Sequence, residues 1–277
     1  MKKFASILIA ATALVGVASV GLSGAAYAEA EKTAKSVSFS FEGPFGTFDK
    51  AQLQRGYKVY KEVCSNCHSM KLIAFRNLAD KGGPGFTPEQ VKALATSFKI
   101  HDLNDAGEGI DRPGLASDYF PSPFATPAAA AAALGAAPPD LSLITKAREG
   151  WHGTFNQLVN GVGGPQYVYS ILTGYEKAPE DLAKDAPAGK FYNPYFENGV
   201  WISMPTNGNL TDGSVTFDDG APNKVDDMAK DVSAFLAWTA EPKMEERKQT
   251  GFEVMIYLLI LAGLMYALKR KVWSDIH

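Results

Sequence analysis

The clearest pattern along the chain is the three- and four-residue spacing of apolar positions that is typical of amphipathic helices. Before the first cysteine, such positions alternate with lysine, glutamine and arginine: Leu53, Gly56, Tyr57, Tyr60 and Val63. Either Thr47 or Asp49 can cap the start of this helix. Similar patterns predict helices over about residues 49–64, 87–98, 164–174 and 224–239, and no segment alternates convincingly with the two-residue period of a strand.

The last of these helices carries an apolar stripe, which predicts a buried position: Val225, Met228, Val232, Phe235 and Leu236. Residues 121–139, PSPFATPAAAAAALGAAPP, are of low complexity, and Pro127 can start a short alanine helix that Gly135 ends. We interpret this segment as a surface excursion without a chemical role. The chain has 26 Gly and 16 Pro, so we predict a mainly α fold in which long loops wrap a small helical core.

Both ends of the chain carry a long apolar segment. Residues 1–28 begin with Met-Lys-Lys, continue through ILIAATALVGVASVGL and finish at Ala-Tyr-Ala. A short positive start, an apolar run and an A-x-A end are typical of a secretory signal peptide that is cut after Ala28. A membrane helix is the alternative, but the small residues at the end of the segment argue against it.

The second apolar segment is VMIYLLILAGLMYAL, from Val254 to Leu268, and Lys269-Arg270-Lys271 follows it directly. It has no polar face, as a buried core helix would need, so we predict a single transmembrane anchor over residues 251–273. The basic cluster places the tail, residues 274–277, in the cytoplasm by the positive-inside rule. Residues 29–250 then form one domain in the periplasm, on the outer side of a bacterial inner membrane.

The charge balance narrows the choice of partners. Leaving out the leader and the two C-terminal segments leaves 22 basic and 28 acidic residues, a net charge of −6. Nucleic acid is an improbable partner for such a domain. A basic protein partner is favoured, because complementary charge speeds encounter.

The only two cysteines stand in the stretch EVCSNCHSM, at Cys64 and Cys67, with His68 directly after the second. Four roles are possible for these cysteines: a redox disulfide, a structural disulfide, half of a zinc site, or the attachment of a covalent haem. A thioredoxin-like site needs a strand before its helix, whereas a helical pattern precedes Cys64, and no second ligand pair stands at zinc spacing. C-x-x-C-H in an exported protein is typical of covalent c-type haem attachment, with the imidazole facing the iron. A disulfide stays the alternative.

The second axial ligand of such a haem is ordinarily methionine or histidine. Met204 stands in the loop FENGVWISMPTNGN, which is rich in Gly, Asn and Pro, and a loop methionine can approach a metal freely. Two histidines remain open alternatives, His101 and His152. Three other methionines fit less well, because they stand beside the first histidine, in the core stripe or next to the membrane segment: Met70, Met228 and Met244.

The longer pattern around these residues is specific. In order along the chain stand RGYKVYKEVCSNCHSMKLIAFRNL, YFPSPF, APPDLSLITKAREG, GGPQYVYSILTGY, FYNPYFENGVWISMP and VTFDDGAPNKVDDMAKDVSAFLAWTAEPKMEERKQTGF. From about Val37 to Trp273 this chain resembles the cytochrome c1 family, the haem subunits of ubiquinol–cytochrome c reductase. The combination of PPDLS, LTGY, NPYF and WTAEPK carries the resemblance more than CxxCH alone.

The resemblance implies roles for individual residues. Cys64 and Cys67 match the positions that hold one covalent haem c, and His68 and Met204 match the axial ligands of the iron. Arg148 matches an arginine that lies near a haem propionate. Two further residues match positions that line the haem pocket: Tyr167 and Pro139. The implied fold is a cytochrome-c-like helical haem domain elaborated by long loops, plus one C-terminal transmembrane helix.

The resemblance also implies partners: cytochrome b, the Rieske iron–sulfur protein and a soluble c-type cytochrome as electron acceptor. The chain would pass single electrons and would not be an enzyme by itself. A free-standing, membrane-tethered electron shuttle and a haem sensor or peroxidase are the alternatives.

Two departures from relatives bear on the site. Many members have Asn and Gly before PPDLS, where this chain has Ala-Leu-Gly-Ala-Ala, and a second cysteine pair found in some bacterial members is absent. We therefore expect packing and hydrogen bonds to hold the Met204 loop.

Overall fold

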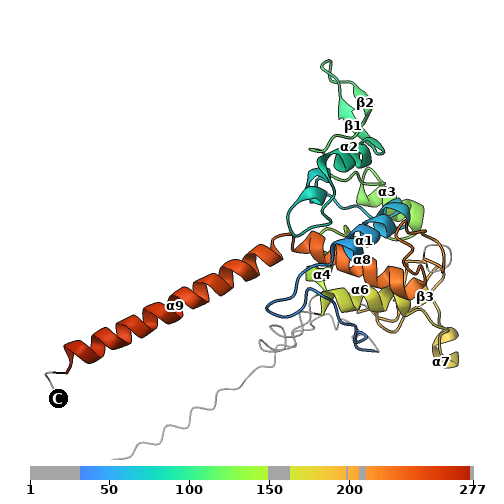
Figure 1. The fold of residues 1–277 in the computed structure, drawn as a ribbon. Coiled ribbons are helices and arrows are strands. Elements are labelled where there is room, and N and C mark those ends of the chain that lie inside the picture. Colours follow the sequence, from blue (N-terminus) through green and yellow to red (C-terminus); the bar gives the residue numbers. More distant parts are fainter. Residues whose placement is uncertain (1–31, 149–162, 198, 206–209, 275–277) are drawn as a thin grey trace, which may run out of the picture.

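The computed structural model describes residues 32–148, 163–197, 199–205 and 210–274; the leader predicted over residues 1–28 lies outside them. The described chain is mostly helical (Figure 1). Its helices and short 3₁₀ turns are α1 (Lys50–Glu62), η1 (Cys64–Asn66), η2 (Phe75–Ala79), α2 (Pro88–Thr96), α3 (Pro127–Leu134), α4 (Ile144–Ala147), α6 (Gly164–Thr173), α7 (Glu180–Ala183), α8 (Val225–Ala240) and α9 (Met244–Val272). Its strands form two antiparallel pairs: β1 (Lys99–Leu103) with β2 (Gly109–Pro113), and β3 (Phe191–Tyr192) with β4 (Trp201–Ile202).

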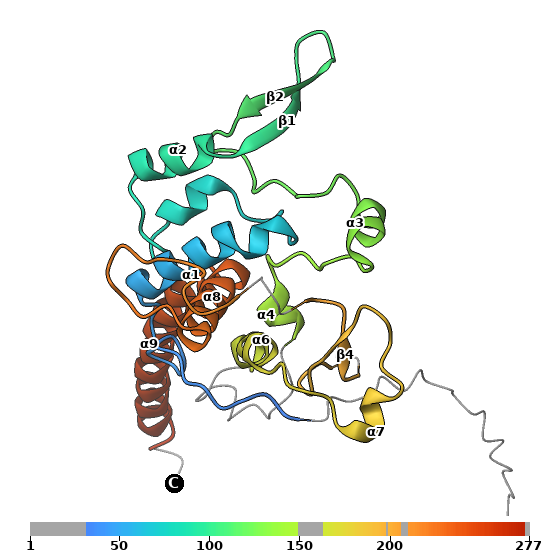
Figure 2. The same cartoon turned by 90° about the vertical axis from the view of Figure 1, so that its right-hand side faces the viewer.

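Helices α1 and α8 lie side by side in the middle of the domain (Figures 1 and 2). They approach closely at Gly56, where an added Cβ would stand 2.2 Å from the backbone oxygen of Asp231. Next to this contact, the rings of Tyr57 and Tyr60 pack against Phe235, with centroids 5.8 and 6.0 Å apart. The small residue therefore lets the aromatic side chains of both helices interdigitate into one core.

A buried ion pair ties the same two helices together. The Arg55 Nε donates to Asp231 Oδ2 at 2.7 Å, and Gln52 Nε2 donates to Oδ1 of the same carboxylate at 3.1 Å. The Asp231 side chain is only 7% exposed. Burial raises the pKa of Asp231 despite the arginine, so removing Arg55 alone would leave a costly unpaired carboxylate in the core.

The predicted helices are confirmed within one or two residues. Asp49, rather than Thr47, caps α1 by accepting a hydrogen bond from the Gln52 amide at 3.1 Å. The alanine helix α3 begins at Pro127 and ends at Leu134, and its C-cap Gly135 adopts the left-handed conformation with φ of 77°. The stripe predicted on α8 is buried except at its first residue, which is partly exposed: Val225, Met228, Val232, Phe235 and Leu236.

The chain shows no alternating pattern, as the sequence indicates, yet the described residues contain two short antiparallel strand pairs that this pattern did not predict. The β1–β2 hairpin projects from the domain beyond α2 (Figure 2). Its residues are exposed on both faces apart from Ile100 and Arg112, which are partly buried, so no alternation of apolar and polar residues marks it. The turn carries the missed signal: the Asn104 side chain accepts from the amides of Ala106 and Glu108, as an Asx turn does.

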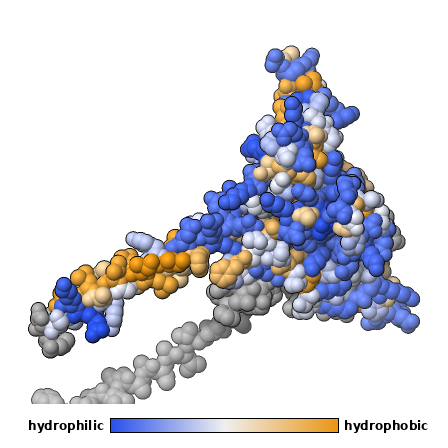
Figure 3. Space-filling view, viewed as in Figure 1, coloured by the Kyte–Doolittle hydropathy of each residue, from blue (hydrophilic) through white to orange (hydrophobic). Residues whose placement is uncertain are grey.

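The C-terminal helix α9 is a continuous helix of 29 residues that leaves the domain as a straight rod (Figure 1). Among the described residues it is the one helix long and apolar enough to cross a membrane, and its apolar window is not buried. Figure 3 shows a hydrophilic start, an apolar middle and a hydrophilic end.

Helix α9 begins before the predicted anchor over residues 251–273, and its first two turns pack on the domain. Met244 is buried, and Glu245 accepts a hydrogen bond from the Phe48 amide at 2.7 Å. Lys248 Nζ donates to the carbonyl oxygens of Phe41 and Gly46 at 2.7 and 3.0 Å. The polar stretch before the anchor is thus a helical junction fixed to the domain.

Candidate functional site

The end of helix α1 carries both cysteines and the following histidine. The helix ends at Glu62, and the 3₁₀ turn η1 begins at Cys64. The amides of Cys67 and His68 donate to the Cys64 carbonyl oxygen at 3.1 and 2.9 Å. One tight turn therefore holds the three side chains of the C-x-x-C-H motif.

The hydrogen bond of His68 fixes the tautomer of its ring. Nδ1 lies 2.8 Å from the Pro139 carbonyl oxygen, which can only accept, so Nδ1 carries the proton and Nε2 keeps its lone pair. Burial lowers the pKa of His68, although this hydrogen bond and Asp140 work in the opposite direction. The imidazole is therefore neutral near pH 7, which is the form that binds a metal.

The cysteines do not resemble a reactive redox pair. Burial, with a smaller contribution from Cys67, raises the pKa of the Cys64 thiol to about 12. Catalytic redox cysteines have lowered pKa values and attack as thiolates. This environment argues against the thioredoxin-like alternative.

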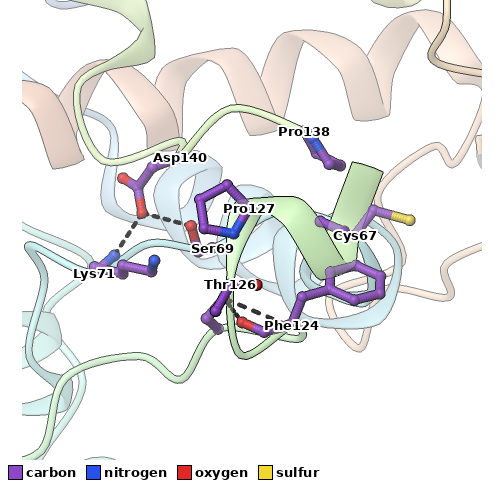
Figure 4. Close-up of a pocket in the computed structure, with 10 residues that line it drawn as sticks. Cys67, Ser69, Lys71, Phe124, Thr126, Pro127, Pro138 and Asp140 are labelled. Carbon is purple, nitrogen blue, oxygen red and sulfur yellow. Dashed lines mark hydrogen bonds between the residues drawn. The ribbon is translucent and has the colours of Figure 1, made fainter. Parts of the chain in front are cut away.

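The segment Pro139–Ser142 lies directly against the chain that follows His68. The Leu141 amide donates to the Ser69 carbonyl oxygen at 2.8 Å, and the Leu72 amide donates to Ser142 Oγ at 3.1 Å. The Asp140 carboxylate accepts from Ser69 and Lys71, as Figure 4 shows. Pro139, expected in the pocket from the resemblance, thus contacts the histidine through its backbone.

A cavity of about 130 Å³ lies beside Cys67 (Figure 4). Its walls include Pro127 and Ala130 of α3, together with Phe124 and Pro138. The low-complexity segment 121–139 is therefore more than a surface excursion, because it lines a space next to a cysteine of the site. Its Ala-rich composition gave no sign of this contact.

Met204 lies in a second apolar cluster, built on helix α6 and strand β4. Its side chain is partly buried, and the cluster contains the buried Tyr167, Ile171 and Ile202. The Tyr175 hydroxyl donates to the Met204 carbonyl oxygen at 2.9 Å. Packing and this hydrogen bond hold the methionine segment, as expected for a chain without a second cysteine pair.

Arg148 and Tyr167 lie together at the edge of this second cluster. The guanidinium carbon of Arg148 is 5.9 Å from the centre of the Tyr167 ring, and its Nε is 3.6 Å from Glu197 Oε2. The Arg148 side chain is 29% exposed, so it keeps donors available for a further anionic partner.

The predicted residues thus fall into two groups: Cys64, Cys67, His68 and Pro139 in one, and Arg148, Tyr167 and Met204 in the other. Among the described residues, no hydrogen bond or ion pair joins the groups, but helices α4 and α6 connect them. An added Cβ on Gly164, at the start of α6, would lie 1.8 Å from the Thr145 carbonyl oxygen of α4. In Figure 2, the end of α1 and strand β4 lie on the same side of the domain.

Of the two histidines that were alternatives for the second ligand, the structure describes only His101. His101 lies on strand β1, where its side chain is 88% exposed and pairs with Asp111. A side chain this exposed on the projecting hairpin is a poor candidate for a buried metal ligand. His152 lies outside the described residues.

Comparison with known proteins identifies the family. The model of the Cytochrome C1 family matches residues 39–276. A cytochrome c1 of Cereibacter sphaeroides is 42% identical, with 91% of each chain covered, and a mitochondrial cytochrome c1 of Arabidopsis thaliana is 42% identical over 96% of this chain and 82% of its own. A cytochrome b/c1 of Bradyrhizobium diazoefficiens is 53% identical over 86% of this chain, which spans 35% of that longer protein. This chain belongs to the cytochrome c1 family.

Proposed function

We propose that this chain holds one covalent haem c on Cys64 and Cys67 and passes single electrons within a bc1 complex. Members of the family are haem-containing subunits of that complex and act in electron transport. The observation that carries the proposal is the hydrogen bond from His68 Nδ1 to the Pro139 carbonyl oxygen, directly after the two thiols. It leaves Nε2 as a neutral nitrogen donor, and this donor set fits a c-type haem.

In this proposal, Met204 would supply the second protein ligand of the haem iron. A thioether needs no deprotonation and suits an apolar surrounding, which Tyr167, Ile171 and Ile202 supply. When bound, the haem supplies one-electron exchange between ferric and ferrous iron. Thioether ligation and burial both favour the ferrous state, so these residues raise the potential of the couple.

Arg148 is proposed to bind a haem propionate. Its guanidinium already packs over Tyr167 and faces Glu197, and a planar fork of donors suits a carboxylate. The Tyr167 ring would hold the arginine in place, because the guanidinium packs over it and the ring is buried in the second apolar cluster.

The proposed electron path runs from the Rieske iron–sulfur protein through this chain to a soluble c-type cytochrome, with cytochrome b as the membrane partner. The domain over residues 29–250 carries the net charge of −6. Part of that charge is engaged internally, since Lys58 pairs with Asp218 at 3.3 Å and Arg55 with Asp219 at 3.0 Å. Glu180 and Asp181, in the first turn of α7, are exposed and supply charge toward a basic partner.

The apolar helix α9 supports a single-pass anchor in the inner membrane. By the positive-inside rule, the basic last turn of Lys269, Arg270 and Lys271 after the apolar middle supports a haem domain in the periplasm and a tail in the cytoplasm. The chain would be a redox subunit without substrate bond chemistry of its own.

Purification in mild detergent tests the proposal. A haem-stained denaturing gel should show stain at the mass of this chain, and the co-purified complex should reduce cytochrome c in a quinol-dependent manner. A variant with both cysteines replaced by alanine is the control and should lose the stain. Haem stain without a co-purifying b-type cytochrome would favour the free-standing shuttle, and carbon monoxide binding by the reduced parent would favour the sensor or peroxidase.

A further inference from the structure

The strap Pro139–Ser142 and the segment His68–Leu72 are about 70 positions apart in sequence and are joined by a ladder of hydrogen bonds. The ladder begins at His68 Nδ1 with the Pro139 carbonyl oxygen, and it ends with the Leu72 amide and Ser142 Oγ. Such a ladder fixes the position of the one carbonyl group that holds the imidazole.

The carboxylate of Asp140 lies at the centre of this ladder. Its Oδ2 accepts from Ser69 Oγ at 2.7 Å and from the Lys71 amide at 2.9 Å, and its Oδ1 accepts from the Ser142 amide at 2.9 Å. Figure 4 shows the carboxylate directed toward Ser69 and Lys71. One side chain thus binds both the strap to which it belongs and the segment that carries the histidine.

These bonds hold the carboxylate in its charged form. Burial alone would raise the pKa of Asp140, but hydrogen bonds from Ser142, the Lys71 amide and Ser69 outweigh it and keep the pKa below its usual value. Hydrogen bonds to a charged acceptor are about twice as strong as neutral ones. The strap is therefore anchored more firmly than backbone contacts alone would anchor it.

We propose that Asp140 is a positioning residue for the axial histidine, because it locks the Pro139 carbonyl oxygen onto His68 Nδ1. The inference rests on the proposed function, in which His68 Nε2 binds the iron. A ligand imidazole that donates its other N–H to a fixed acceptor keeps one orientation and becomes a more basic donor. A more basic nitrogen favours ferric iron, so Asp140 lowers the potential that Met204 and burial raise.

Replacing Asp140 with Glu tests the inference, since this variant keeps the charge but moves the carboxylate. The midpoint potential of the haem-loaded full chain in detergent should rise, with the redox equilibrium shifted about tenfold toward the ferrous state, or about 59 mV for one electron. Ser69→Ala removes one donor without touching the charge and should shift the potential in the same direction by less. Asp118→Glu is the matched control, because the partners of Asp118, Arg112 and the Leu115 amide, belong to neither segment.

Asp140→Asn separates position from charge. A raised potential in both Asp140 variants and in Ser69→Ala supports positioning. A parent-like potential in Asp140→Glu and Ser69→Ala, with a rise in Asp140→Asn alone, would show that only the charge acts and would overturn the inference. A lowered potential in Asp140→Glu would overturn it as well. Should Asp140→Glu fail to attach haem, Ser69→Ala decides the question, whereas a parent without haem stain would instead refute the proposed function.

Discussion

The contact between α1 and α8 at Gly56 gives the sharpest test of the fold. Replacing Gly56 with Ala places a methyl group 2.2 Å from the Asp231 carbonyl oxygen and 2.6 Å from the Phe235 Cβ. Both neighbours belong to α8, and one is backbone, so neither can move aside as the tip of a flexible side chain could. The helices must separate by about 1 Å to restore ordinary van der Waals contact.

Two opposing effects set the size of the change. Alanine stabilises a helix interior by about 1 kcal/mol relative to glycine. Overpacking a well-filled core costs about 1–3 kcal/mol, and a backbone contact this short belongs at the upper end of that range. The free energy of unfolding should therefore fall by about 2 kcal/mol, which lowers the melting temperature by about 4–8 °C for a domain of this size.

Thermal unfolding of the haem-loaded full chain in detergent, followed by circular dichroism, measures this change. Gly109→Ala is the control, because no atom lies within 4 Å of the added Cβ and the substitution removes the same backbone freedom in the same domain. The control should melt at or above the parent temperature. If Gly56→Ala also melted at or above that temperature, the close packing of α1 on α8 would be wrong.

Three further predictions follow from the proposed function and the anchor. Met204→Leu should keep the covalent haem, bind carbon monoxide when reduced and lower the midpoint potential on the order of 100 mV, since a tenfold change in a one-electron equilibrium is about 59 mV. Redox titration measures the potential, with Met70→Leu, a substitution of a buried core methionine, as the control. An unchanged potential would exclude Met204 as ligand. Truncation after Thr250 should release a soluble, haem-containing domain, because the contacts of Glu245 and Lys248 are retained; export without haem attachment would contradict a separable anchor. Reduction of a basic soluble cytochrome should slow as salt rises, because charge steering is screened within about 10 Å at 0.1 M salt. If electron transfer from this haem is rate-limiting and the rate does not change with salt, the idea that acidic residues guide the docking would be wrong.

The helices of the core could be predicted because their burial leaves a pattern. Most positions of helix α8 that face its neighbours are apolar, and α1 carries the same periodicity. The alanine helix was predictable for a different reason, since Pro127 and Gly135 are a start and a stop signal of their own. Local chemistry sufficed in both cases.

The strap could not be predicted because its partners lie elsewhere in the chain, and the only local sign of the hairpin noted above is the turn at Asn104. The β1–β2 hairpin is held by contacts such as that between Arg112 and Asp118, at 2.6 Å, rather than by an apolar face. Asp140 looked like one acidic residue among 30 acidic positions, and its partners Ser69 and Lys71 become visible only after the chain has folded back. The motif located the cysteines and His68, but the support of the histidine depends on tertiary structure.

Helix α9 runs without a break from the domain into its apolar middle, so it fixes the rotation of the domain about the helix axis relative to the apolar segment. Each residue added to a helix turns everything beyond it by about 100° and advances it by about 1.5 Å. With Glu245 and Lys248 fixing the first turns to the domain, one residue inserted near Gly251 would swing the whole domain about the helix axis. Seven inserted residues would nearly restore its heading while lifting it by about 10 Å. Heading and height above the bilayer can therefore be varied separately by insertion length alone.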